Sequence, residues 1–230
     1  MKYISKNISE HAAKFIRFFL MFVAPEKESI RKLERVYPSE LARILPAATA
    51  VATAKNLSAL FAYKDRLVKD VVWEIKYRKN LALAEKIGVL LFEKMEAQMH
   101  AQAINGAEII LAPIPTSSAR RKERGFNQCE IICEAVMKNF QKDEKMREIF
   151  SYEPNLLAKI KNTPHQADLT REERLVNVVG SFAIPHPEKV RGKIIFIVDD
   201  VITTGRTIGE AEAVLTAAGA KSIYGFSIAH

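Results

Sequence analysis

Cysteine is scarce in this sequence, and its scarcity excludes two kinds of fold. Only Cys129 and Cys133 occur among 230 residues. Two cysteines are too few for a disulfide scaffold and half the number that a structural zinc site normally uses. We expect both to be small buried residues of a protein in a reducing cytoplasm.

Long apolar runs are also missing. The most apolar N-terminal stretch, residues 12–24, contains Lys14 and Arg17. It is shorter than the roughly 20 residues that span a bilayer, and a charged run without a clear signal-peptide cleavage site follows it. An amphipathic helix packed on the main domain is the better interpretation, and no stable membrane insertion is expected.

Two common phosphate-binding loops are absent as well. A Walker A loop would need glycine where Asp200 stands and lysine where Arg206 stands, and no G-x-G-x-x-G occurs anywhere. The chain nevertheless carries a formal charge of +8. That excess suits an anionic partner such as a nucleotide, a diphosphate or nucleic acid, or it belongs to a solvated basic surface.

Apolar patterning predicts an α/β fold with a mostly parallel, twisted sheet flanked by helices. The continuous apolar run of residues 108–115, ended by prolines, is typical of a strand buried on both faces. Residues 1–60 alternate helix-like stretches with prolines and carry no chemical motif, so they predict a helical accessory region before a main domain of residues 61–230. The other predicted elements are helices at 63–79, 81–100 and 128–140 and strands at 155–160 and 180–184.

The last fifty residues predict a βαβ unit. Its parts are a strand at 193–198, a loop at 199–206, a helix at 207–218 and a strand at 222–229. In open sheets of this kind, ligands bind beyond the carboxyl ends of the strands. A binding site is therefore expected in the loop.

The residues of that loop favour a phosphorylated sugar. Backbone N–H groups of residues 203–207, with the positive end of the following helix, would form a concave site for a phosphate. Gly205 allows a close approach or a positive φ, and threonine hydroxyls add donors. Asp199 and Asp200 cannot hold a phosphate, so they are expected to serve ribose hydroxyls or a magnesium ion nearby.

This segment resembles the type I phosphoribosyltransferases, whose signature is a hydrophobic strand, two acidic residues and a Thr/Gly-rich loop. The resemblance implies the type I phosphoribosyltransferase fold and 5-phosphoribosyl 1-diphosphate as ligand. It also implies that Asp199 and Asp200 hold the ribose 2′- and 3′-hydroxyls, and that Mg²⁺ is held mainly by diphosphate and sugar oxygens. The implied ligand-binding residues of this strand and loop are Val198, Asp199, Asp200, Val201, Thr203, Thr204, Gly205, Arg206 and Thr207.

Further segments are similar to the ComF family of competence-associated proteins. These are Arg-Gly-Phe-Asn-Gln at 124–128, the polar stretch 161–182, Asp-Asp-Val-x-Thr-Thr-Gly at 199–205, and Trp-Glu-Ile-Lys-Tyr-Arg at 73–78. The similarity covers roughly residues 59–230. Members of that family usually begin with a cysteine-rich zinc ribbon, whereas the first 128 residues here contain no cysteine, so the ribbon is expected to be missing.

The basic and polar segments supply the remaining candidates. Residues 161–177 are expected to form a lid, with Arg171 and Arg174 as catalytic contacts to the diphosphate. Asp199 and Asp200 are the other catalytic candidates. The further candidates for substrate binding are Pro115, Thr116, Arg120, Lys122, Arg124, Gln128 and Gln166.

Two functions remain open from the sequence. One is transfer of the phosphoribosyl group to an unidentified nitrogen nucleophile. The other is a non-catalytic factor in DNA uptake that binds phosphoribosyl diphosphate or single-stranded DNA and acts with the competence machinery. A nucleotide-responsive regulator is less favoured because no DNA-reading element is recognisable, and self-association as a homodimer stays open.

Overall fold

The computed structural model describes residues 27–49, 56–104, 106–160 and 180–230. The chain divides into two units, residues 1–35 and 36–230. In the first unit the described part is helix α2 (Glu28–Arg35), which has an exposed ion pair between Lys32 and Glu28 one turn apart. The boundary predicted at residue 60 remains a prediction, and the following paragraphs concern the second unit.

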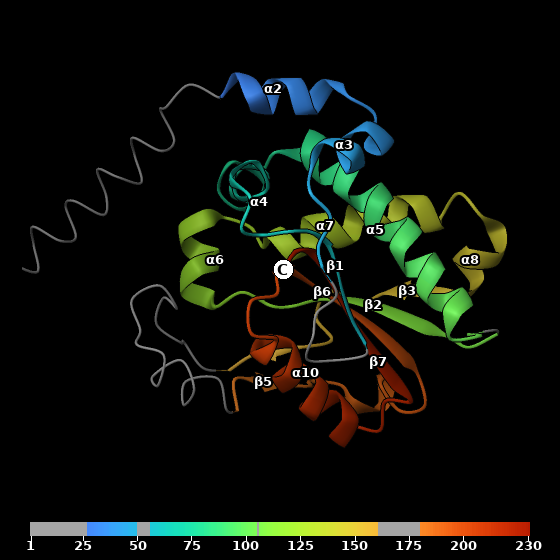
Figure 1. The fold of residues 1–230 in the computed structure, drawn as a ribbon. Helices are drawn as coiled ribbons and strands as arrows, with labels where there is room; N and C mark the ends of the chain where they lie inside the picture. The colour runs from blue at the N-terminus through green and yellow to red at the C-terminus, as the bar shows by residue number, and fades with distance from the viewer. Residues whose placement is uncertain (1–26, 50–55, 105, 161–179) are drawn as a thin grey trace, which may run out of the picture. The chain divides into compact units, whose positions relative to one another are not determined.

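A five-stranded parallel sheet forms the centre of the second unit (Figure 1). All four neighbouring pairs of strands are parallel, which confirms the predicted α/β class. The central strand is buried along nearly its whole length, as its apolar sequence predicted. In sheet order the strands are β1 (Leu57–Phe61), β7 (Ser222–Ala229), β6 (Ile194–Val201), β2 (Ile109–Pro113) and β3 (Phe150–Tyr152).

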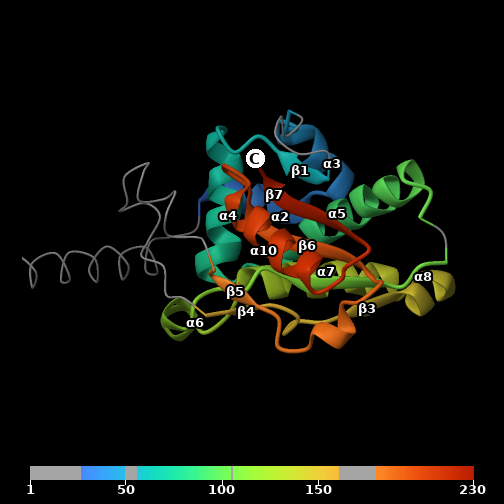
Figure 2. The same cartoon turned by 90° about the horizontal axis from the view of Figure 1, so that it is seen from below.

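Helices cover both faces of this sheet (Figure 2). Three of them, α4 (Arg66–Arg78), α5 (Leu81–Ala101) and α7 (Gln128–Phe140), lie on one face, and α10 (Arg206–Ala217) lies on the other. The predicted helices at 81–100 and 128–140 therefore match their observed bounds to within one residue.

Side chains of β6 alternate between the two faces, as the period of a strand requires. Ile195 and Ile197 belong to a core with residues of α10. Phe196 instead packs against Phe150, which stacks on Phe140 of α7. Two acidic residues in succession on this strand must therefore be directed toward opposite faces of the sheet.

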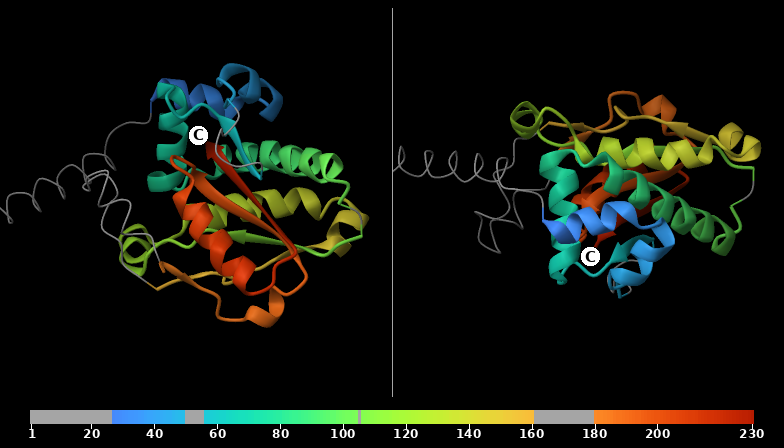
Figure 3. Two further views of the ribbon diagram at one scale, coloured as in Figure 1. Left: turned by 60° about the horizontal axis from the view of Figure 1, so that its bottom comes forward. Right: turned by 90° about the horizontal axis from the view of Figure 1, so that it is seen from above.

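The connections that leave β2 and β6 diverge. Strands β2 and β6 are neighbours, but the chain continues from β2 to β3 on one side and from β6 to β7 on the other. Figure 3 shows the segments that follow these two strands separating at the same edge of the sheet. Ligands of open α/β sheets bind at such a topological switch point.

Several elements differ from those predicted. The predicted strands at 155–160 and 180–184 are reduced to β4 (Ala158–Lys159) and β5 (Phe182–Ala183), which form a separate antiparallel pair. Strands β1 and β3 were not predicted, and α6 (Ser118–Arg124) forms in a stretch for which no helix was predicted. The remaining short elements are α3 (Pro38–Ile44), α8 (Glu144–Ile149) and the 3₁₀-helix η2 (Pro187–Lys189).

Helix α6 has clear local causes. The Ser117 side chain accepts a hydrogen bond from the backbone N–H of Arg120, which caps the start of the helix. Gly125 ends it in the left-handed conformation, with φ of 80°. In the part of the chain that the structure describes, no helix is long and apolar enough to cross a membrane.

Candidate functional site

The two acidic residues lie at the carboxyl end of β6, inside the strand and not in the loop after it. The predicted loop of 199–206 is therefore too long, because Asp199 still pairs with Ser227 of β7 and Val201 with Ala229. Asp199 and Asp200 are only 9% and 6% exposed. Buried carboxylates need partners, and those of the two residues differ.

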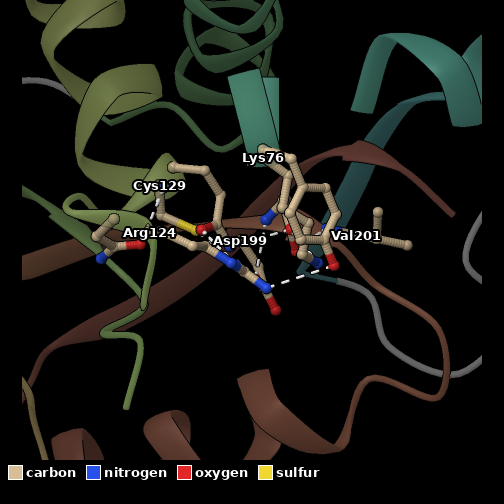
Figure 4. Close-up of polar contacts among 9 residues, drawn as sticks. Lys76, Arg124, Cys129, Asp199 and Val201 are labelled. Carbon is tan, nitrogen blue, oxygen red and sulfur yellow. Dashed lines mark hydrogen bonds and ion pairs between the residues drawn. The ribbon is translucent and has the colours of Figure 1, made fainter. Parts of the chain in front are cut away.

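Asp200 is held by three donors. Its Oδ2 accepts hydrogen bonds from Nζ of Lys76 at 2.6 Å and from Nε2 of Gln128 at 3.0 Å (Figure 4). Its Oδ1 accepts from the backbone N–H of Val201 at 2.8 Å. Burial would raise the pKa of Asp200, but the charge and hydrogen bond of Lys76 outweigh burial and lower it. Asp200 is therefore an ionised, fixed group.

Asp199 has weaker partners. Its Oδ1 accepts from the backbone N–H of Asp200 at 2.9 Å and lies 3.7 Å from Sγ of Cys129. Burial, and then the charge of Asp200, raise the pKa of Asp199 to about 7. A side-chain hydrogen bond with Asp200 also helps to raise the pKa of Asp199, so Asp199 is the carboxyl group of the pair with the fewest donors and the one that a ligand can use.

The loop after β6 presents backbone N–H groups. Gly205 has φ of 73° and caps α10 without any side-chain hydrogen bond, so of the two possibilities that the sequence offered for this residue, the positive φ is observed. The first N–H groups of a helix have no acceptor within the helix. Because Thr203 and Thr204 are exposed and Thr207 is half-buried, hydroxyls and amides at this helix start are accessible to an anion.

Four basic side chains surround the acidic pair. Lys76 comes from α4, Arg120 and Arg124 from α6, and Lys159 from β4. Burial, and then the charge of Arg124, lower the pKa of Arg120. Burial, and then the charge of Arg120, lower the pKa of Lys159, which is attracted by Asp199. Because four cations face two carboxylates, the local charge favours a polyanion.

Helix α6 separates the predicted basic candidates by their surroundings. Lys122 is exposed to solvent. Arg124 lies over the ring of Tyr77, at 4.6 Å from the ring centre, and donates to Oε1 of Gln128 at 3.2 Å. Arg121, which was not a candidate, forms an ion pair with Glu130. Of the basic residues on this helix, Arg120 and Arg124 are therefore those brought to the acidic pair.

The other predicted residues divide into those placed near the site and those not described. Val198 is buried in β6 and paired with Pro113 of β2. Pro115 and Thr116 are half-buried where the chain leaves β2. Gln166, Arg171 and Arg174 lie outside the described residues.

Lys76 and Lys159 were missed. Lys76 stands in the Trp-Glu-Ile-Lys-Tyr-Arg segment, which had been noted for its similarity but not as a source of site residues. Lys159 stands in a predicted strand. Neither local pattern signals a site, because only tertiary packing brings these side chains to the end of β6.

The two cysteines behave as predicted. Cys129 and Cys133 are buried and unpaired by disulfides. Burial raises the pKa of both thiols, so both stay protonated and unreactive at neutral pH. Among the described residues, no group of three or more His, Cys, Asp or Glu side chains could hold a metal ion.

Comparison of the sequence with known proteins shows one matching family and several named relatives. The model of the phosphoribosyl transferase domain family matches residues 82–224. DNA utilization protein YhgH of Escherichia coli (strain K12) is 24% identical over 158 residues, which cover 68% of this chain and 64% of that protein. Competence protein ComFC of Streptococcus pneumoniae is 28% identical over 174 residues, covering 74% of this chain and 66% of that protein.

A similar solved structure is a hypoxanthine phosphoribosyltransferase from Staphylococcus aureus, with 14% identity, a TM-score of 0.34 and 62% of each chain covered. The family match and the names of the relatives confirm the resemblance inferred from the sequence motifs. The chain spans just under two thirds of the length of the YhgH protein.

Proposed function

Since this chain belongs to the phosphoribosyl transferase domain family, we propose that it binds 5-phosphoribosyl 1-diphosphate at the carboxyl ends of β2 and β6. One observation carries the proposal. A buried acidic pair and a helix start without a side-chain cap follow one another at a topological switch point, with four basic side chains near the acidic pair. This combination offers separate places for a phosphate, a ribose and a diphosphate.

The 5-phosphate would lie at the start of α10. The open N–H groups there and the positive end of the helix attract a dianion. Thr203, Thr204 and Thr207 supply hydroxyl donors, and Gly205 has no side chain to obstruct the ligand. Val201 and Arg206 border the same loop.

The ribose hydroxyls would be held by the acidic pair, chiefly by Asp199. Asp199 accepts a single backbone hydrogen bond, whereas Asp200 already accepts three hydrogen bonds from Lys76, Gln128 and Val201. Asp200 would then fix the strand end and contribute negative charge beside the sugar ring. That charge stabilises the positive charge that develops on the ring when diphosphate departs.

The diphosphate would lie toward α6 and the end of β2. Arg120 and Arg124 reach the acidic pair from that helix, and Pro115 and Thr116 begin the same connection. Arginine suits this role because its planar fork of donors matches phosphate oxygens. Lys122 is exposed and could approach a bound ligand from outside.

The donor set fits a magnesium ion only when the ligand is present. Mg²⁺ in such sites is held by one or two carboxylates together with substrate phosphates and water. Asp199 would supply the carboxylate, and the ligand would supply the other oxygens. The ion would neutralise negative charge on the departing diphosphate.

The reaction we propose is displacement of diphosphate from C1 of the ribose by a nitrogen nucleophile, with inversion. Asp199 and Asp200 would hold the ring, while Arg120 and Arg124 would stabilise the leaving group. No described residue is placed as a general base, and an already nucleophilic amine does not need one. A cytoplasmic location, where nucleotide metabolism supplies this ligand, is part of the proposal.

Isothermal titration calorimetry with phosphoribosyl diphosphate and Mg²⁺ tests the binding step. We expect Asp199→Asn to weaken binding about 10- to 100-fold, because a hydrogen bond to a charged group contributes roughly 1.5–3 kcal/mol. Asp143→Asn is the matched control, since Asp143 caps α8 through an oxygen that asparagine retains. Unchanged affinity in Asp199→Asn would refute the proposed site.

Diphosphate release in the presence of purine, pyrimidine and amine acceptors tests the transfer step. Turnover with any of them identifies an enzyme. Tight binding without turnover favours the second candidate, a non-catalytic factor that handles single-stranded DNA.

The second candidate is favoured by the basic aromatic surface beside the site. Arg78 lies over the ring of Trp73 at 5.2 Å, Arg124 over Tyr77 at 4.6 Å, and Lys79 over Phe126 at 5.9 Å. Proteins that bind single strands combine cations with aromatic rings on which bases stack. The relatives' names, a DNA utilization protein and a competence protein, agree with such a role.

Fluorescence anisotropy of a labelled single strand, measured over a range of salt concentrations, tests this second function. Binding that weakens steeply with salt and drops in Trp73→Ala would support it. Absence of binding at low salt would exclude it.

A further inference from the structure

Gln128 joins the two ends of the candidate site. Gln128 is the first residue of α7, and it is only 6% exposed. Its amide nitrogen donates to Oδ2 of Asp200 at 3.0 Å, and its amide oxygen accepts from Nη1 of Arg124 at 3.2 Å. Both polar ends of this buried amide are thus occupied by protein groups.

Arg124 is held in place without being neutralised. Its guanidinium lies 4.6 Å from the centre of the Tyr77 ring, and its Nη2 is 3.5 Å from the Tyr77 hydroxyl. Within the described residues no carboxylate forms an ion pair with Arg124, and its buried Nε has no hydrogen-bond partner. Arg121, on the same helix, is instead paired with Glu130.

A fixed cation that has no carboxylate partner among the described residues, and that lies near the cations Arg120 and Lys76, is arranged to receive an anion. We infer that Gln128 and Tyr77 are positioning residues that hold the Arg124 guanidinium for the diphosphate, and that Gln128 links this cation to the acid beside the ribose. The inference rests on the proposed function and gives Gln128 a role other than the direct ligand contact expected from sequence.

The physical benefit is preorganisation. A free arginine side chain loses much rotational freedom when it binds, and holding it beforehand removes that cost from the binding step. Gln128 can hold it because one amide serves both a donor and an acceptor at fixed separation. Tyr77 adds a ring on which the planar guanidinium stacks.

The test compares two ligands in calorimetry, phosphoribosyl diphosphate with Mg²⁺ and ribose 5-phosphate, which lacks the diphosphate. Gln128→Met keeps the side-chain length but has no donor or acceptor of comparable strength. We expect it to weaken binding of phosphoribosyl diphosphate about tenfold and to change ribose 5-phosphate binding by no more than about twofold. Gln141→Met, at the exposed end of the same helix, is the matched control.

A double-mutant cycle separates positioning from general structural support. If Gln128 acts through Arg124, Gln128→Met should have little further effect once Arg124→Met has been introduced. Tyr77→Leu should likewise weaken binding of phosphoribosyl diphosphate more than binding of ribose 5-phosphate. Tyr77→Phe should largely retain the wild-type affinity, because phenylalanine keeps the ring. Since Tyr77 is half-buried, these variants report on the inference even if Gln128→Met fails to fold.

Three outcomes would overturn the inference. They are additive effects in the cycle, equal losses for both ligands, and wild-type affinity in Gln128→Met and Tyr77→Leu. The failures are distinguishable, because a wild-type protein that binds no phosphoribosyl diphosphate overturns the proposed function as well. If the wild-type protein binds phosphoribosyl diphosphate but the effects of Gln128→Met and Arg124→Met on affinity are additive, this inference alone is overturned.

Discussion

Replacing Asp199 by asparagine should raise the free energy of unfolding at about pH 8. Burial, and then the charge of Asp200, raise the pKa of Asp199 from 3.8 to about 7. One pKa unit corresponds to about 1.4 kcal/mol, so ionising Asp199 in the folded protein costs at most roughly 4 kcal/mol. Asparagine removes the charge and keeps an oxygen that can accept from the backbone N–H of Asp200.

The stabilising effect of Asp199→Asn on the free energy of unfolding should depend on pH. Because the folded pKa lies above the unfolded value of 3.8, the folded protein binds more protons between 3.8 and about 7. The stability associated with Asp199 is therefore present below 3.8 and is lost as pH rises toward about 7. Wild type and Asp199→Asn should differ little at about pH 4 and most at about pH 8.

Asp200→Asn should have the opposite effect near neutral pH. It leaves the ammonium of Lys76 without its partner, and breaking a buried ion pair typically costs about 3–5 kcal/mol. The Lys76 side chain is 27% exposed, so water can partly solvate its ammonium group. Loss of the Asp200 carboxylate also removes its electrostatic repulsion with Asp199. We therefore expect a smaller net loss of about 1–2 kcal/mol.

Urea titrations at several pH values, followed by fluorescence of Trp73, measure both effects, since Trp73 is the sole tryptophan. The urea concentration at the midpoint of unfolding should rise for Asp199→Asn and fall for Asp200→Asn. The slope of the unfolding free energy against urea concentration should not change. The reasoning would be refuted if Asp199→Asn gave no gain at about pH 8, or the same gain at every pH.

Three further predictions address packing, the loop and proton release. Gly88→Ala would place a Cβ 2.5 Å from Cβ of Ala135, so urea titration should show a loss of about 1–2 kcal/mol, whereas Gly209→Ala, with open space around it, should stabilise α10. Gly205→Ala forces alanine to a φ of 73°, which should cost about 1–2 kcal/mol and weaken phosphoribosyl diphosphate binding in calorimetry. Binding with Mg²⁺ near pH 7 should release protons in wild type but fewer in Asp199→Asn, seen as a binding heat that depends on the buffer.

The final βαβ unit could be predicted because its signals are local. A continuous apolar run marks β6, and Gly205 with the following periodic residues marks the start of α10. The strand extends past its predicted end because pairing with β7 continues to Val201. A single-sequence pattern does not reveal how far a partner strand continues.

The elements that were missed depend on contacts between distant residues. Strand β1 is only five residues long and pairs with β7, so its stability comes from the far end of the sequence. Lys76 stands on a helix whose periodicity marks it as polar surface, yet α4 lies over the end of β6 and brings Lys76 to Asp200. The acidic pair and the loop could be predicted from the sequence, whereas Lys76 and Lys159, which complete the site, could not.

A crystal structure of the wild-type protein with phosphoribosyl diphosphate and Mg²⁺ tests the central claim most directly. The 5-phosphate should lie against the N–H groups of residues 203–207, with a ribose hydroxyl on Asp199 and the diphosphate near Arg120 and Arg124. A ligand bound elsewhere, or a vacant loop at saturating ligand concentration, would contradict the proposed site.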